Sequence, residues 1–391
     1  MTTVALGDVA AINPRGESVN AEEQVSFVGM AELDAERAIA RPLETREFSE
    51  VAKGYTVFRD GDVLAAKITP CWENGKVGQA RLEHSIGVGS TEFHVLRPSA
   101  SLNDRYLLHF LRQPWVRAAG ELRMTGSAGQ KRVPVTFLQG LRIPLLPLDE
   151  QRRVAAILDH VDALLAKRRK VLARLEHLTQ SIFHDMFDGV AATATLENVA
   201  AAAKGSIRTG PFGSQLLHSE FVDDGIAVLG LDNVVGNEFR WAGRRFITRE
   251  KYAKLARYTV HPGDVLISIM GTTGRCVVVP ADIPTAINTK HICAITPDRE
   301  RIEPDFLRAT FLWHAESRAH LRRQTKGSIM DGLNMGIIKT MPVPVPPLHD
   351  QKEFGARIEQ VNNQRAAVRR ALAADDELFT SLQFRAFRGD L

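Results

Sequence analysis

The chain has 391 residues, enough for two or three domains, and its 44% hydrophobic and 25% charged residues are ordinary for a globular protein. A formal net charge of +4 and a sequence pI of about 9.0 permit a nucleic-acid partner without requiring one. The three cysteines, Cys71, Cys276 and Cys293, form no CxxC pair, which argues against zinc and favours a reducing, cytoplasmic compartment. No signal peptide is expected, because residues 1–11 contain Asp8 and no basic flank precedes an apolar run, and no membrane span is expected, because no apolar run is long enough.

The first segment, residues 1–146, mixes strand and helix patterns. Apolar alternation around an Asp-Gly turn predicts a hairpin within Tyr55–Leu64, and Ser90–Arg97 reads as a further strand. Asp104–Arg117 carries apolar residues at helical spacing, which predicts one helix there. Two polar, glycine-containing loops separate these elements: Lys67–Lys76 and Thr125–Arg132.

A long helix is predicted over residues 147–189, behind a proline-rich leader that is held extended. Its apolar residues recur at heptad spacing over four heptads, interrupted only by Arg168. About 37 helical residues span roughly 55 Å, and a single helix cannot bury such a seam alone. The two seam positions hold Val154, Val161, Leu175 and Ile182, and Ile157, Leu164, Val171 and Leu178.

The same plan returns about 200 residues later, which indicates an internal repeat. The second segment, residues 190–346, echoes the first in Tyr258–Leu266, and it ends on the same kind of leader. The second helix supplies the partner that the first requires, and the spacing across the repeat junction predicts that the two chain ends lie close together. Residues that match without a gap are Pro147 and Pro347, Leu148 and Leu348, Gln151 and Gln351, Phe187 and Phe387, and Gly189 and Gly389.

No catalytic constellation is found in the sequence. Gly126–Lys131 lacks the GxxxxGK[ST] spacing of a phosphate loop, and GxSxG, HExxH and GxGxxG do not occur. The 12 histidines are scattered, so they are better explained as surface or packing residues than as metal ligands. The sequence therefore predicts a binding protein with no catalytic residues, no metal and no cofactor.

Basic and amide side chains cluster with glycine in the loops. Arginine can read guanine edges, asparagine can read adenine, and lysine, serine and threonine can hold phosphates. Solvated loops without a partner would look similar, but a small-residue and basic loop recurs before both leaders, which favours a shared role. The candidate DNA-contacting residues are Lys67, Asn74, Lys76, Lys131, Arg132, Arg208, Phe212, Ser214, Thr272, Thr273, Arg275, Asn288, Lys290, Lys326 and Ser328.

These motifs resemble those of the specificity subunit of type I restriction–modification enzymes. The leader IPLLPLDEQ (143–151) and its echo VPVPPLHDQ (343–351) carry the resemblance, together with the long helix after each. PFGS (211–214) and the stretch GDVL…GTTGR (263–275) are also similar. The resemblance covers essentially the whole chain, and the repeated leader is its most specific part.

The resemblance implies an α/β (α+β) fold with a pseudo-twofold internal repeat. Two target-recognition domains, residues 1–146 and 190–346, would alternate with two long antiparallel coiled-coil helices, residues 147–189 and 347–391. Each domain would read one half of a split, asymmetric site on double-stranded DNA. The helices would fix the separation and dock two modification (methyltransferase) subunits, which restriction subunits with ATP-dependent translocase and nuclease activity would join.

The second helix departs from the pattern of the first, since Arg357, Gln364 and Asp375 interrupt its seam. A coiled-coil protein scaffold without DNA recognition is the alternative, and it predicts binding that is insensitive to salt. An enzyme would need an acidic metal cluster or a methyltransferase motif, and the sequence has neither. Residues expected in the spacer and docking helices are Val154, Ile157, Val161, Leu164, Val171, Leu175, Leu178, Ile182, Val361, Val368, Leu372 and Leu382.

Overall fold

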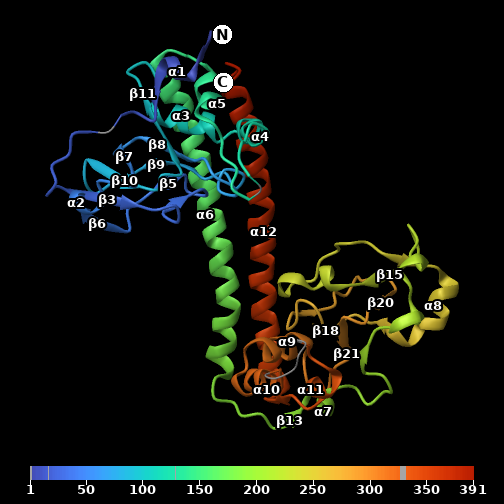
Figure 1. Cartoon of the computed structure of the whole chain (residues 1–391). Coiled ribbons are helices and arrows are strands. Elements are labelled where there is room, and N and C mark those ends of the chain that lie inside the picture. The colour runs from blue at the N-terminus through green and yellow to red at the C-terminus, as the bar shows by residue number, and fades with distance from the viewer. Residues whose placement is uncertain (1, 16, 128, 326–331) are drawn as a thin grey trace. The chain divides into compact units, whose positions relative to one another are not determined.

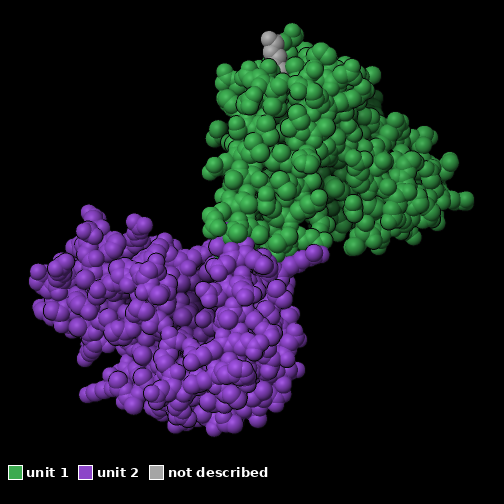
Figure 2. Space-filling model, turned by 180° about the vertical axis from the view of Figure 1, so that it is seen from behind, with its two compact units in different colours: residues 1–172, 367–391 green, residues 173–366 purple. Residues whose placement is uncertain are grey.

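The computed structural model describes residues 2–15, 17–127, 129–325 and 332–391 and divides them between two compact units (Figure 2). Unit 1 comprises Met1–Leu172 and Ala367–Leu391, and unit 2 comprises Ala173–Ala366. Two long helices, α6 (Leu148–Phe187) and α12 (Leu348–Ala386), each contribute one end to each unit. Each unit is thus a globular part built onto two helical ends.

Two sheets form most of the globular part of unit 1. Its strands are β1 (Thr3–Ala5), β2 (Ala10–Ile12), β3 (Gln24–Val28), β4 (Leu33–Asp34), β5 (Ile39–Ala40), β6 (Glu44–Glu47), β7 (Thr56–Arg59), β8 (Val63–Ala66), β9 (Val77–Ala80), β10 (Ile86–Gly89), β11 (Phe93–Pro98) and β12 (Arg142–Pro144). The larger sheet has the order β2-β11-β8-β9-β5-β4, the smaller has the order β6-β3-β10-β7, and β1 pairs with β12.

The predicted hairpin within Tyr55–Leu64 is wrong, although its turn is present. Gly61 adopts a φ of 85° between β7 and β8, but β7 pairs with β10 and β8 pairs with β9 and β11. The chain crosses from one sheet to the other because Phe58 and Leu64 both bury their side chains in the core between the sheets. The same crossing recurs in unit 2, at the matching residues.

Small helices close one end of unit 1, around the start of α6 and the end of α12 (Figure 1). They are α1 (Leu6–Val9), α3 (Asp104–Leu111), α4 (Pro114–Glu121) and α5 (Val135–Gly140), while α2 (Phe48–Val51) lies apart on the smaller sheet. The single helix predicted over Asp104–Arg117 is two helices. Gln113 is extended, with φ −62° and ψ 137°, because a residue before proline disfavours helical geometry.

Unit 2 repeats this plan. Its strands are β13 (Ala194–Thr195), β14 (Ile207–Thr209), β15 (Ile226–Leu229), β16 (Phe246–Ile247), β17 (Thr259–Val260), β18 (Val265–Ser268), β19 (Cys276–Val278), β20 (Ala286–Asn288), β21 (Ile292–Ile295) and β22 (Pro342–Val343). The sheets have the orders β14-β21-β18-β19 and β16-β15-β20-β17, with the pair β13-β22. The parallel pair β3-β10 of unit 1 recurs as β15-β20.

Helices and 3₁₀ turns complete unit 2. The α-helices are α7 (Leu196–Val199), α8 (Arg249–Leu255), α9 (Pro304–Trp313), α10 (Ala315–Thr325) and α11 (Met335–Lys339). The 3₁₀ turns are η1 (Gly213–Gln215), η2 (His218–Glu220), η3 (Leu231–Asn233), η4 (Val235–Asn237) and η5 (Ala256–Tyr258). Residues of α9, α10 and α11 share one core cluster with the end of α6 and the start of α12 (Figure 1).

The predicted seam of α6 is right at one heptad position and wrong at the other. Val154 and Val161 are buried as expected, but Leu158 and Leu165 are buried beside them, while Ile157 and Leu164 are only half-buried. Val171 and Leu178 are 40% and 42% exposed. Apolar residues occupy both neighbouring positions, so heptad spacing alone does not choose between them. Of the remaining seam residues, Leu175 and Val361 are buried and Ile182, Val368, Leu372 and Leu382 are half-buried.

Two of the polar interruptions of the predicted seams meet in unit 1. Arg168 of α6 forms an ion pair with Asp375 of α12, so each charge satisfies the other inside the helical contact. Both chain ends also lie in this unit, since Val4 and Leu391 pack against the same hydrophobic cluster. Among the described residues, no helix has the length and apolar content needed to cross a membrane.

Candidate nucleic-acid interface

The first candidate loops lie side by side in unit 1. The amide of Thr69 donates to the carbonyl of Lys131 at 3.0 Å, and the amide of Val133 donates to the carbonyl of Lys67 at 2.9 Å. These bonds bring the 67–76 loop against the 125–132 loop, where Gly126 adopts a φ of 127°. Lys131 is exposed and Lys67 is half-buried, and their backbones lie on these two adjacent loops.

Arg132 is held by a carboxylate beneath this surface. Its Nε and Nη2 donate to Glu92 at 2.9 and 2.7 Å, a two-pronged ion pair that lowers the pKa of Glu92. Lys76 is also committed, because its Nζ donates to the carbonyl of Met30 at 2.7 Å. Asn74 is exposed at the neighbouring turn. Of these three candidates, Asn74 therefore presents the least committed side chain.

A cavity of about 800 Å³ lies beside the PFGS loop of unit 2. The η1 loop forms one wall, and the 289–291 loop, which includes Lys290 and His291, forms another. Phe212 is 47% exposed beside it, and Ser214 is exposed in η1. Burial lowers the pKa of His291, with Lys290 adding to the effect. The structure thus brings Lys290 to the PFGS loop, as a shared site requires.

The turn at 268–275 lies next to this cavity. The buried hydroxyl of Ser268 donates to the carbonyl of Thr272 at 2.6 Å and accepts from the amide of Arg275 at 2.9 Å. Thr272 is exposed and Thr273 half-buried, whereas the Nε of Arg275 is buried with no hydrogen-bond partner among the described residues. Ser268, which the sequence analysis missed, therefore shapes the turn.

Two candidates point into the fold instead. Arg208 is buried, pairs with Asp264 and donates through Nε to the carbonyl of Thr259 at 3.1 Å. Asn288 is fully buried and donates to the carbonyl of Ile292 at 2.7 Å. Both side chains hold strands together in unit 2. These two residues therefore have a structural role, although arginine and asparagine are also residue types that can contact DNA. Two further candidates, Lys326 and Ser328, lie outside the described residues.

Two matched glutamines join each globular part to its following helix. Gln151 accepts from the amide of Asn103 at 2.7 Å and donates to the carbonyls of Ser101 and Leu146 at 2.9 and 2.8 Å. Both glutamines are fully buried. The second makes the same three bonds to backbone groups: Gln351 accepts from Glu303 at 2.9 Å and donates to Arg301 and Pro346 at 3.1 and 2.8 Å. The sequence showed the match but not its role.

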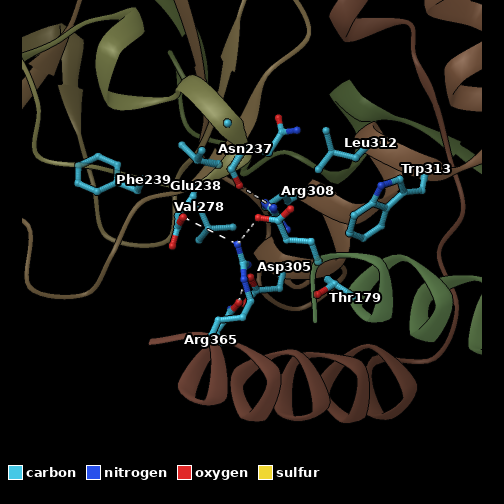
Figure 3. Close-up of a pocket in the computed structure, with 14 residues that line it drawn as sticks. Thr179, Asn237, Glu238, Phe239, Val278, Asp305, Arg308, Leu312, Trp313 and Arg365 are labelled. Carbon is cyan, nitrogen blue, oxygen red and sulfur yellow. Dashed lines mark hydrogen bonds and ion pairs between the residues drawn. The ribbon is translucent and has the colours of Figure 1, made fainter. Parts of the chain in front are cut away.

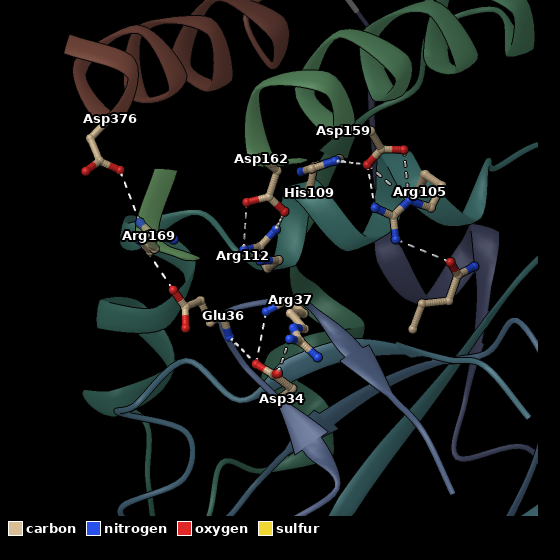
Figure 4. A network of polar contacts seen from close by, with 11 residues as sticks. Asp34, Glu36, Arg37, Arg105, His109, Arg112, Asp159, Asp162, Arg169 and Asp376 are labelled. Carbon is tan, nitrogen blue, oxygen red and sulfur yellow. Dashed lines mark hydrogen bonds and ion pairs between the residues drawn. The ribbon is translucent and has the colours of Figure 1, made fainter. Parts of the chain in front are cut away.

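Ion pairs reinforce this joint in unit 1 (Figure 4). Asp159 Oδ1 lies 2.5 Å from Arg105 Nη2 and 2.7 Å from His109 Nε2. Burial alone would raise the pKa of Asp159, but the hydrogen bonds from His109 and Arg105 lower it to about 2. Burial lowers the pKa of His109, whose Nδ1 has no hydrogen-bond partner among the described residues. A second proton on that ring would therefore lack an acceptor. Arg112 and Asp162 form a further pair at 2.6 Å.

A cluster of aromatic rings joins the globular part of unit 2 to both long helices. The ring centroid of Phe306 in α9 lies 4.7 Å from Phe187 and 6.0 Å from Phe183, both in α6. Phe354 of α12 lies 5.7 Å from Phe187 and 5.8 Å from Phe183. All four rings are buried, so the contact is dry and apolar.

A polar cavity of about 420 Å³ lies beside the aromatic joint of unit 2, between the globular part and both helical ends (Figure 3). Arg308 donates from Nη2 to the carbonyl of Asn237 at 2.7 Å and from Nε to that of Cys276 at 3.2 Å. Burial raises the pKa of Asp305 and lowers that of Arg308. Glu176, Glu238 and Arg365 also line this cavity.

Comparison with known proteins shows which family has this architecture. A sequence model described as "Type I restriction modification DNA specificity domain" matches residues 1–177 and 230–372. The specificity subunit of the type I restriction enzyme EcoEI from Escherichia coli is 38% identical over 203 residues, which are 50% of this chain and 34% of that subunit. The EcoAI specificity subunit from Escherichia coli is 43% identical over 148 residues, 37% of this chain and 25% of that subunit. The matches therefore span about a third and a quarter of these relatives.

A solved structure shares the fold over nearly the whole chain. The S subunit of a type I restriction–modification system from M. genitalium is 14% identical, covers 99% of this chain and 96% of its own, and superposes with a TM-score of 0.60. The shared fold has mixed α/β content, and the family model covers more than half of the sequence. The chain belongs to the family of type I restriction–modification DNA specificity domains.

Proposed function

We propose that this protein is the DNA sequence-specificity subunit of a type I restriction–modification complex. The observation that carries the proposal is the repetition of one globular topology, attached to the long helices by the same glutamine bonds in each unit. A bipartite, asymmetric duplex site needs two different readers held in one register, and a repeat with divergent loops meets that need. Family membership supports the same reading.

The two globular parts would act as target-recognition domains. Exposed or half-exposed candidates support this role: Lys67, Asn74 and Lys131 in unit 1, and Phe212, Ser214, Thr272, Thr273 and Lys290 in unit 2. Lysines would hold phosphates, and Asn74 and the threonines would meet base edges or phosphates. Arg208 and Asn288 are left out of this surface because internal partners hold their side chains.

The long helices would form an antiparallel coiled coil that separates the two domains and docks two modification subunits. A helix of 40 residues is about 60 Å long, several times the width of a DNA groove. Exposed apolar residues such as Val171, Leu178, Leu378 and Phe384 support docking, since such side chains favour burial against a partner. Methyl transfer and cleavage would belong to the modification and restriction subunits, and this chain would be non-catalytic and cytoplasmic.

Methylated bases mapped in cells that express this chain with its modification subunit test the proposal. We expect one split motif, with two half-sites of fixed separation. Lys131→Ala and Lys290→Ala should each weaken duplex binding by the assembled complex and reduce its salt slope by about one. Each should act through contacts to one half-site only.

Lys352→Ala is the matched control, because Lys352 is an exposed lysine on α12 outside both candidate surfaces. It should leave the affinity and the salt slope unchanged. An assembled complex that binds no duplex, or binds it without any dependence on salt, would instead support a coiled-coil scaffold without DNA recognition.

A further inference from the structure

In each unit, one arginine of a long helix contacts an acid on the other helix and an acid on the globular part. In unit 1 this is Arg169 of α6, whose Nη2 lies 3.3 Å from Asp376 of α12. Its Nε lies 3.4 Å from Glu36, in the loop between β4 and β5 (Figure 4). The guanidinium thus joins three elements that are distant in the sequence.

Unit 2 contains the same arrangement. Arg365 of α12 lies with its Nη2 3.6 Å from Glu176 of α6. The same nitrogen lies 3.9 Å from Glu238, which follows the η4 turn of the globular part (Figure 3). Three elements meet again at one guanidinium, at the edge of the polar cavity.

The internal repeat relates the two bridges. Glu176 and Asp376 occupy the same position in the repeat that matches Gln151 to Gln351. In both units the arginine lies on the helix that follows the globular part, and the helical acid lies on the other helix. The arginines differ by one helical turn, because Arg365 corresponds to Leu165 rather than to Arg169. A comparison of the two helices by sequence therefore does not reveal the correspondence.

Both acids of the globular parts are presented by braced loops. Asp34 accepts hydrogen bonds from the amides of Glu36 and Arg37 at 2.9 and 3.0 Å, which fixes the turn that carries Glu36. Asn237, with a φ of 58°, accepts a bond from the amide of Cys276 at 3.0 Å and so anchors the turn before Glu238. The carboxylates are therefore held where the arginines reach them.

We propose that Arg169 and Arg365 are positioning residues that fix the orientation of each globular part on the helical pair. The glutamine joint holds each part at one point, near Gln151 or Gln351. Arg169 and Arg365 lie about 27 and 21 Å further along their helices, at 1.5 Å per residue. A body held at two such points cannot pivot about the first. Resting on the proposed function, this orientation would set the angle at which each domain meets its half-site.

The contribution of each bridge is small, which suits a positioning role. Losing a partly exposed ion pair should change the ratio between two orientations by up to about fivefold, the equivalent of about 1 kcal/mol. The larger change is expected at Arg365, which is 15% exposed, against 37% for Arg169. Neither loss should unfold its unit.

Spin-label distances in the full chain without DNA test the proposal. Labels at Lys254, on α8, and at Gln360, on α12, are both exposed and report the orientation within unit 2. Arg365→Met should broaden or split the distance distribution while the unfolding midpoint falls by no more than about 4 °C, and Arg365→Lys should restore the narrow distribution. The control Arg357→Met removes an exposed pair within α12 and should change neither.

An unchanged distribution in Arg365→Met overturns the proposal, as does broadening of the same size in Arg357→Met. Because the measurement needs no DNA, it does not depend on the proposed function. Broadening together with an assembled complex that binds no duplex would support the bridge and overturn DNA recognition. Broadening together with a methylated motif of relaxed separation would support both.

Discussion

In unit 1 the globular part meets the long helices through ion pairs to α6 and through Tyr106 and Phe110 packed on Phe387, whereas in unit 2 it meets them through four packed phenylalanines. By the repeat, Phe183 and Phe354 correspond to Gln383 and Val154. The glutamine bonds to the backbone are nevertheless the same in both units. Side-chain chemistry at the joint has therefore diverged, while the groups that satisfy buried backbone atoms have not.

The largest difference between the joints should appear when an aromatic ring is removed. Phe183→Ala leaves a cavity among three buried rings and should destabilise unit 2 by about 3–5 kcal/mol, as measured by hydrogen exchange of its core amides. The equivalent Gln383→Ala should cost unit 1 much less, because the side chain removed is smaller and polar and the ring contacts of Tyr106 and Phe110 with Phe387 remain. Phe384→Ala, at an exposed ring, serves as the control. Equal costs at positions 183 and 383 would contradict the comparison.

Replacing the glutamines should show where the joints are alike. Gln151→Leu and Gln351→Leu each leave one amide and two carbonyls without their partner, at a cost of about 1–3 kcal/mol. Protection of the backbone amide from hydrogen exchange should fall at Asn103 in Gln151→Leu and at Glu303 in Gln351→Leu. The two losses should be of similar size, while Gln364→Leu, on the exposed side of α12, should have little effect. A loss confined to one unit would show that the joints differ in their backbone support too.

Acid should produce the smallest effect, and mainly in unit 1. The folded unit binds the His109 proton less tightly than the unfolded chain, so its free energy of unfolding should fall below about pH 6.5. The pKa of Asp159 is lowered to about 2, so the stabilisation from that group is present above about pH 4 and is lost as the pH falls towards 2. Thermal unfolding of each unit, followed as a function of pH, measures these changes in the free energy of unfolding.

Unit 2 should respond in the opposite sense at its cavity. Burial raises the pKa of Asp305, so the folded unit binds that proton more tightly and gains stability as the pH falls through the raised value.

Asp159→Asn should flatten the response of unit 1 below about pH 4. If unit 1 kept its dependence on pH in that variant, the titrating group would lie elsewhere.

The internal repeat and the lengths of the two long helices could be predicted from the sequence, because both depend on patterns within a continuous segment of the chain. Strand pairing could not be predicted, because β7 and β8 belong to different sheets although a tight turn joins them. The predicted heptad register of α6 was wrong at one position for a related reason. Ile157 and Leu158 are both apolar, and only contact with the packed surroundings decides that Leu158 is the buried one.

The candidate surface shows the same division. Lys131 and Lys290 are exposed on their loops, where glycine and basic residues predicted them to be. Arg208 and Asn288 have the same chemistry, but neighbours distant in the sequence hold them inside the fold. Composition indicates that a side chain can contact DNA, and burial decides whether it is free to do so.

The glutamine joint also makes the two globular parts interchangeable in principle. Each glutamine bonds only to backbone atoms, so these three bonds do not depend on the side chains of the domain that they hold. A different domain could be spliced in ahead of Pro147 or Pro347 and would find the same three bonds, provided that its backbone follows the same path there. Under the proposed function, such modularity would let one half of the recognised DNA site change while the helices stay as they are.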